Sequence, residues 1–122
     1  MRIRRQEFEF LVRRAIKELP PAFRARLVGV DVVIEDAPSP ELRVELGLEP
    51  GELLFGLYDG VPLTHPDRYA APWRLPDRIL LFQRTFERTC ATPQEVLDEV
   101  RSTIIHEVGH HFGLSEDQLE EV

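Results

Sequence analysis

The sequence predicts an α+β domain, because two segments with helical periodicity flank three segments that are typical of strands. The first helical segment spans residues 6–19, and the second begins at Thr92 and runs through Phe112. The strand segments are rich in β-branched and aromatic residues and cover residues 28–35, 52–58 and 78–86. No repeat or low-complexity stretch divides the chain, so we expect one domain over residues 1–122.

Charge and composition argue against several classes of function. Asp and Glu number 22 against 15 Lys and Arg, which gives a formal net charge of −7. Such a chain repels phosphate on average, so we expect no nucleic-acid partner and no anionic membrane partner. We see no apolar run near the roughly 18 residues of a membrane span and no leader segment, and therefore expect a cytoplasmic location. Cys90 is the single cysteine, so the chain cannot form an internal disulfide.

The N-terminal helix is predicted to be amphipathic. Its apolar residues recur at steps of three and one from Phe8 to Leu19, and Pro20 then ends it. We expect the apolar face to pack on the sheet. A short second helix is predicted over residues 39–46, where Ser-Pro has the pattern of an N-cap and a first helical residue, and Gly47 ends it.

The middle of the chain is rich in proline. Residues 61–63 can resume as a strand edge after the Asp-Gly turn signal. Residues 64–77 are predicted to form a loop, which is either a flap over a site or simply irregular packing. We interpret His65, within this loop, as a surface histidine rather than a metal ligand.

The C-terminal helix has clear signals at both ends. Thr92 as N-cap, Pro93 at the first helical position and Glu95 three residues after the cap form a capping box. Gly113 is the expected residue with positive φ just beyond the end of the helix. We therefore expect a well-defined helix that holds whatever residues it carries at fixed angles.

This helix carries the motif that points to chemistry. Residues 106–116 read HEVGHHFGLSE, which is the pattern H-E-x-x-H-x-x-G-x-x-E. His106 and His110 are four residues apart, so both imidazoles lie on one face of the helix and can bind one zinc ion. Glu107 would lie beside the metal as a candidate general base. A chain of this composition would contain the extended pattern by chance in roughly two cases in ten thousand.

The periodicity of the helix separates the histidines from the core. Its apolar residues cluster opposite His106, and the more polar face carries both His106 and His110. The clustered residues are Leu97, Val100, Ile104 and Val108. His111 falls close to the apolar stripe, so we assign it to structure rather than to the metal.

The residues alone do not decide which side chain is the third metal ligand. Gly113 lets the chain leave the helix sharply, and an oxygen ligand three residues later could complete three protein ligands. Glu116 has that spacing, and Asp117 competes with it. Residues 115–118 also have the pattern of a capping box for a terminal helix, in which case neither acid binds metal.

The motif is similar to the zincin signature in its metzincin extension, H-E-x-x-H-x-x-G-x-x-(H/D). More closely, the chain resembles the small bacterial minimal-zincin family of possible metallopeptidases. The resemblance extends to residues 54–63 (LFGLYDGVPL) and residues 76–79 (PDRI). It implies a zincin-like α+β fold, with a small mixed sheet packed on the N-terminal helix and on the motif helix. It also implies Zn²⁺ bound by His106, His110 and Glu116.

The chain departs from its relatives at two places. The family usually has Asp where this chain has Glu116, which is longer by one methylene group. Larger metzincins place a methionine turn beneath the metal, whereas the only methionine here is Met1. We see no second subdomain after the motif, so we expect a homo-oligomer or a partner protein to complete the substrate cleft.

We therefore predict a zinc metallopeptidase that acts on a peptide or protein substrate. Zinc would lower the pKa of its water, and Glu107 would take the proton. Residues 78–86 are predicted to be an edge strand that pairs with extended substrate, and Tyr58, Tyr69 or an arginine could stabilise the oxyanion. One alternative is a non-catalytic zincin-fold protein that binds metal or another protein. A second is a metal-dependent ribonuclease, but the negative net charge and the presence of Glu107 speak against it.

Overall fold

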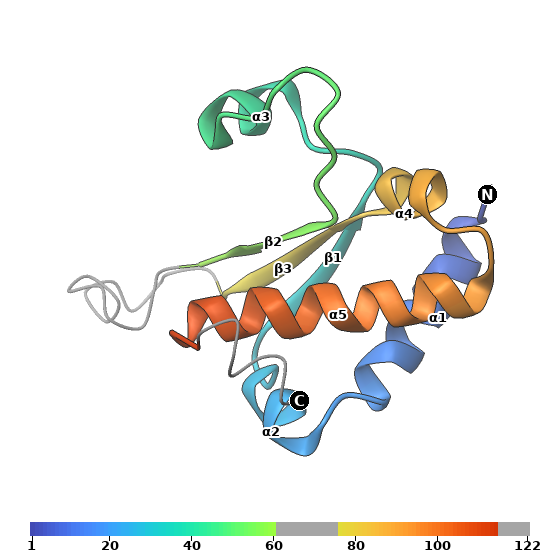
Figure 1. Cartoon of the computed structure of the whole chain (residues 1–122). Coiled ribbons are helices and arrows are strands. Elements are labelled where there is room, and N and C mark those ends of the chain that lie inside the picture. The colour runs from blue at the N-terminus through green and yellow to red at the C-terminus, as the bar shows by residue number, and fades with distance from the viewer. Residues whose placement is uncertain (61–75, 115–122) are drawn as a thin grey trace.

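The computed structural model describes residues 1–60 and 76–114, and it has the α+β architecture predicted by the sequence (Figure 1). Its elements, in order, are α1 (Arg5–Lys17), α2 (Pro21–Arg26), β1 (Asp31–Glu35), α3 (Pro40–Leu46), β2 (Gly56–Asp59), β3 (Arg78–Phe82), α4 (Gln83–Thr89) and α5 (Pro93–His111). Within the described ranges, none of these helices has the length and apolar character needed to cross a membrane.

The three described strands form one mixed sheet in the order β1-β3-β2. β1 is parallel to β3, with Val33 opposite Leu80, and β2 is antiparallel to β3, with Leu57 opposite the same residue. The mixed sheet implied by the family resemblance is therefore confirmed. β3 is its central strand, and the four residues from Ile79 to Phe82 are all buried.

The prediction of an edge strand over residues 78–86 is wrong. β3 pairs with a neighbour on each side and ends at Phe82, after which the chain turns into α4. The unbroken apolar run in β3 is what a strand covered on both faces requires. From Gln83 onward the buried residues instead follow a helical spacing, and Phe86 packs on the rings of Phe8 and Phe55.

Two elements near the N-terminus differ from the prediction. Residues 21–26 form α2, in which Pro21 is the first helical residue; the proline pair that stops α1 therefore also begins the next helix. The first strand starts at Asp31 rather than at residue 28, because Gly29 has a φ of +79° and turns the chain just before it.

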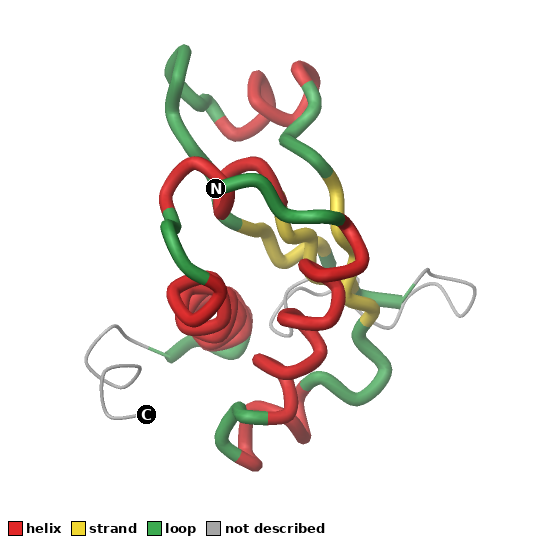
Figure 2. Tube along the Cα trace, turned by 90° about the vertical axis from the view of Figure 1, so that its right-hand side faces the viewer, coloured by secondary structure: helices red, strands yellow, loops and turns green. Residues whose placement is uncertain are grey.

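Helix α1 packs chiefly against α5 and also meets the sheet, as expected. Figure 2 looks along α5 and shows α1 running across its side. Buried residues of the two helices meet Ile79 and Leu81 of β3 in one apolar cluster. The two helices thus share one face of the sheet.

The short helix α3 has the ends that the sequence predicts. The Ser39 side chain accepts a hydrogen bond from the Leu42 N–H at 3.1 Å, and Gly47 has a φ of +68°. Arg43 donates to the backbone carbonyls of Glu49 and Glu52, which fixes the loop that leads toward β2.

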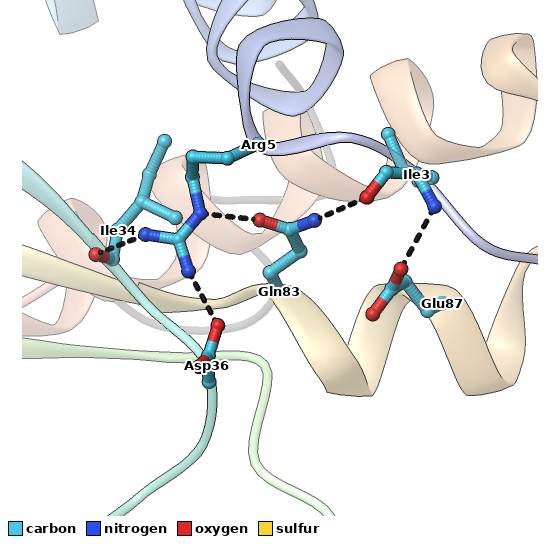
Figure 3. A network of polar contacts seen from close by, with 6 residues as sticks. All are labelled: Ile3, Arg5, Ile34, Asp36, Gln83 and Glu87. Carbon is cyan, nitrogen blue, oxygen red and sulfur yellow. Dashed lines mark hydrogen bonds and ion pairs between the residues drawn. The ribbon is translucent and has the colours of Figure 1, made fainter.

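A polar network fastens the N-terminus to the rest of the domain (Figure 3). The Gln83 amide accepts from Arg5 Nε at 2.7 Å and donates to the Ile3 carbonyl at 2.8 Å. Arg5 also contacts Asp36, and the Ile3 N–H donates to Glu87. The buried amide of Gln83 thereby has partners on both sides, as a buried polar group requires.

Cys90 is buried between α4 and α5 and has no cysteine partner. Burial raises the pKa of its thiol, so little thiolate is present at neutral pH. These properties are those of a packing residue, in keeping with the absence of an internal disulfide.

Candidate metal centre

Helix α5 begins and ends where the sequence places it. The Thr92 side chain accepts from the Glu95 N–H at 3.2 Å, and the Glu95 carboxylate accepts from the Thr92 N–H, which completes the capping box. The helix ends at His111, and Gly113 has a φ of +78°. The Leu114 N–H then bonds back to the Gly109 carbonyl at 2.8 Å, which closes the last turn.

The apolar side of α5 faces the core as predicted. All four residues of the predicted stripe are at most 1% exposed, namely Leu97, Val100, Ile104 and Val108. His106 is half-buried and His110 is exposed on the other side. The helix therefore directs both histidines away from the apolar cluster.

The geometry of the two histidines fits a shared zinc ion. Nδ1 of His106 lies 2.9 Å from the Ser102 carbonyl, which can only accept, so Nδ1 carries the proton and Nε2 keeps a lone pair for a metal. The ring centroids of His106 and His110 are 6.2 Å apart. Zinc binds an imidazole nitrogen at about 2.0 Å. The centroids of two imidazole rings that bind the same ion are therefore about 5–6 Å apart. A shared ion would require the two rings to lie slightly closer together than they do here.

The predicted third ligand follows these two histidines in the chain. Within residues 1–60 and 76–114, no three His, Cys, Asp or Glu side chains are grouped so that they could hold a metal ion. Glu116, Asp117, His65 and the oxyanion candidate Tyr69 fall outside those ranges. The assignment of Glu116 as ligand stays a prediction.

Glu107 reaches across from α5 to the sheet. Its carboxylate accepts a hydrogen bond from the backbone N–H of Tyr58 in β2 at 3.4 Å. Burial raises the pKa of Glu107, while the Tyr58 N–H, His110 and His106 act in the opposite direction. A carboxylate with a raised pKa is a stronger base, which suits it to take a proton near neutral pH.

The Tyr58 contact also shows how β2 is oriented. Backbone groups alternate in direction along a strand, and the Phe55 carbonyl bonds to Phe82 at the start of the pair with β3. The backbone groups of Gly56 and Tyr58 therefore face the opposite, outer edge, where Glu107 lies. Among the described strands, β2 forms the edge of the sheet beside the motif.

Gly56 allows β2 to approach α5 closely, a feature that the sequence did not predict. A Cβ atom at this position would lie 2.7 Å from the Leu80 carbonyl oxygen and 2.9 Å from Cγ2 of Thr103. The Leu80 carbonyl belongs to the backbone of the central strand, so it cannot move aside without disturbing the sheet. The close approach is what brings the Tyr58 N–H within reach of Glu107.

We expect the Gly56→Ala substitution to lower the free energy of unfolding by about 2 kcal/mol, because the added methyl group overpacks this contact. Urea denaturation followed by circular dichroism measures the change. Leu53→Val, at an exposed position just before β2, is the control and should change stability by less than about 0.5 kcal/mol. Equal stability of the Gly56→Ala protein and the native protein would contradict the tight packing.

A buried cluster joins the end of α5 to the sheet. The rings of Tyr58 and His111 stack with centroids 3.9 Å apart at an interplanar angle of 15°. The Tyr58 hydroxyl donates to Asp77 at 2.9 Å, and His111 Nε2 lies 3.7 Å from the same carboxylate. The side chains of His111 and Asp77 are 5% and 6% exposed. The burial of His111 agrees with its assignment to structure, and the Tyr58 hydroxyl is directed to Asp77.

Comparison with known proteins gives matches of two kinds. The sequence matches the family described as zincin-like metallopeptidase over residues 27–122. Among solved structures, the chain is similar to a conserved hypothetical protein from Thermo thermophilus, with 30% sequence identity and a TM-score of 0.55. That alignment covers 87% of this chain and 91% of the other. No curated protein matches.

The family match spans both the sheet and the motif helix. It includes β2 with its Tyr58 N–H, β3 and the whole of α5, so it covers every described residue of the candidate centre. On these grounds, the chain belongs to the zincin-like metallopeptidase family.

Proposed function

We propose that the protein is a zinc-dependent peptidase in which Glu107 is the general base. His106, His110 and Glu116 would hold the zinc. The observation that carries the proposal is the position of the Glu107 carboxylate. It follows a zinc-competent histidine on α5 and is hydrogen-bonded to the outer edge of β2 at 3.4 Å.

Bound zinc would supply Lewis acidity toward a water molecule and the scissile carbonyl. Glu107 would accept the proton of the attacking water as the water oxygen bonds to the carbonyl carbon. It would then deliver that proton to the amine nitrogen as the C–N bond breaks. The hydrogen bond from Tyr58 fixes one carboxylate oxygen and leaves the other available for the proton.

The substrate would lie along β2, not along residues 78–86 as first expected. The outward backbone groups of Gly56 can pair with an extended peptide, which is strand addition to a sheet edge. A peptide held there passes beside Glu107. The edge strand thus provides both the register of the substrate and the orientation of the base.

A cleavage screen tests this function. The zinc-loaded protein is incubated with a broad mixture of peptides, and new termini are identified by mass spectrometry. We expect cleavage that disappears when a chelator removes the zinc and returns when zinc is added back. Absence of any cleavage by protein that holds one equivalent of zinc would contradict the proposal and favour a non-catalytic metal-binding protein.

A further inference from the structure

A small cavity adjoins the metal centre on the side toward the start of β2. Its volume is about 220 Å³. The wall on the helix side consists of Glu99, Ser102, Thr103, His106 and the proposed base Glu107, and the wall on the strand side consists of Phe55 and Gly56. Sites for whole small molecules usually measure roughly 300–1,000 Å³, so this cavity is suited to one side chain of a larger ligand.

Glu99 is the charged group in this cavity that the proposed chemistry leaves unused. It lies seven residues before His106 on the same face of α5, which is about 10 Å along the helix axis. It is half-buried, and none of the described residues gives its carboxylate a hydrogen-bond donor or a cation. The adjacent acid Asp98 differs, since it is exposed and bonds to both Gln94 and Arg101.

The direction of β2 relates this cavity to the reaction site. Gly56 packs on Thr103, and two residues later Tyr58 bonds to Glu107, so β2 and α5 run in the same direction here. Two residues of a strand span about 7 Å. A peptide on the outer edge of β2 that passes Glu107 therefore reaches the cavity within one or two residues.

We propose that this cavity is a subsite for a basic side chain, arginine or lysine, of a peptide substrate next to the scissile bond. The aliphatic stem would pack between Phe55 and Thr103, and the cation would meet the Glu99 carboxylate. A partly desolvated carboxylate that has no partner among the described residues favours a cation over a neutral group. The position relative to the scissile bond rests on the proposed peptidase function, whereas the preference for a cation does not.

A binding experiment tests the subsite without depending on hydrolysis. Two peptides are compared that differ only in carrying arginine or citrulline, its neutral isostere. Binding is measured by calorimetry to the zinc-loaded Glu107→Gln protein, which would not consume the peptides. We expect the arginine peptide to bind roughly fivefold more tightly, the effect of a half-exposed ion pair.

Substitutions in that background locate the effect. Glu99→Gln should bring the affinity ratio of the two peptides close to one. Asp98→Asn removes the same charge from the neighbouring residue and should leave the ratio unchanged, which separates a local contact from net charge. A ratio near one before substitution, or a preference for arginine that survives Glu99→Gln, would overturn the subsite.

The cleavage screen keeps this proposal distinct from the peptidase function. Arginine-dependent binding without cleavage by the zinc-loaded native protein sustains the subsite and contradicts the hydrolytic role. Cleavage without enrichment of arginine or lysine beside the scissile bond sustains the hydrolytic role and contradicts the subsite.

Discussion

The Glu107→Gln substitution is expected to lower kcat for peptide hydrolysis by about 10²–10⁴-fold, the usual contribution of a general base. Gln has the same length as Glu, and its carbonyl oxygen can still accept the hydrogen bond from the Tyr58 N–H. It cannot take a proton from water. The rate is measured with a peptide found in the cleavage screen, at saturating concentration, so that an effect on binding does not enter.

Two further measurements show whether the loss of kcat arises in the chemical step rather than from lost zinc or a damaged fold. Elemental analysis should find the same zinc content in the Glu107→Gln and native proteins, because the histidines are unchanged. Thermal unfolding of the two proteins should also agree closely, since the substitution preserves the contact with β2. An undiminished kcat in the Gln variant would show that Glu107 is not the base.

The motif helix was predictable from the sequence because its ends are set by local bonds. Thr92 and Glu95 cap each other within one turn, and Gly113 supplies the positive φ that ends the helix. Such bonds join residues that are near neighbours in the sequence. Helical periodicity then places His106 and His110 on one face and directs Glu107 to one side.

Strand order was not predictable in the same way, because it depends on pairing between distant segments. The assignment of residues 78–86 to an edge failed for this reason, although the unbroken apolar run from Ile79 to Phe82 is typical of a strand buried on both faces. That unbroken apolar run indicates a central strand rather than an edge strand. The switch from strand to helix at Gln83 has no cap or turn signal, since the Phe82 N-cap position makes no side-chain hydrogen bond.

The parts of the candidate site that came only from the structure are backbone contacts. The Tyr58 N–H that binds Glu107 lies 49 residues away in the chain, and any residue other than proline offers the same donor. Gly56 carries a weak signal, because a glycine inside a strand often marks a close approach of another segment. Asp77 gave a signal only as part of the PDRI segment of the family resemblance.

The His106→Ala substitution is expected to weaken zinc binding by more than about 100-fold, because even the loss of a group that only orients a ligand costs 10–100-fold. His106 Nδ1 is hydrogen-bonded to the Ser102 carbonyl, so Nε2 is the nitrogen that would bind a metal. The ring is half-buried and lies outside the apolar cluster. The fold should therefore survive, and circular dichroism of the metal-free proteins should give matching spectra.

Zinc content separates a lost ligand from a damaged fold. Elemental analysis after gel filtration should find about one equivalent of zinc in the native protein and almost none in His106→Ala. His65→Ala is the matched control, because it removes a histidine that we interpret as a surface residue, and it should retain the metal. Zinc that persists in His106→Ala would contradict the proposed site, and with it the proposed role of Glu107, since the base would act only beside a metal that His106 helps to hold.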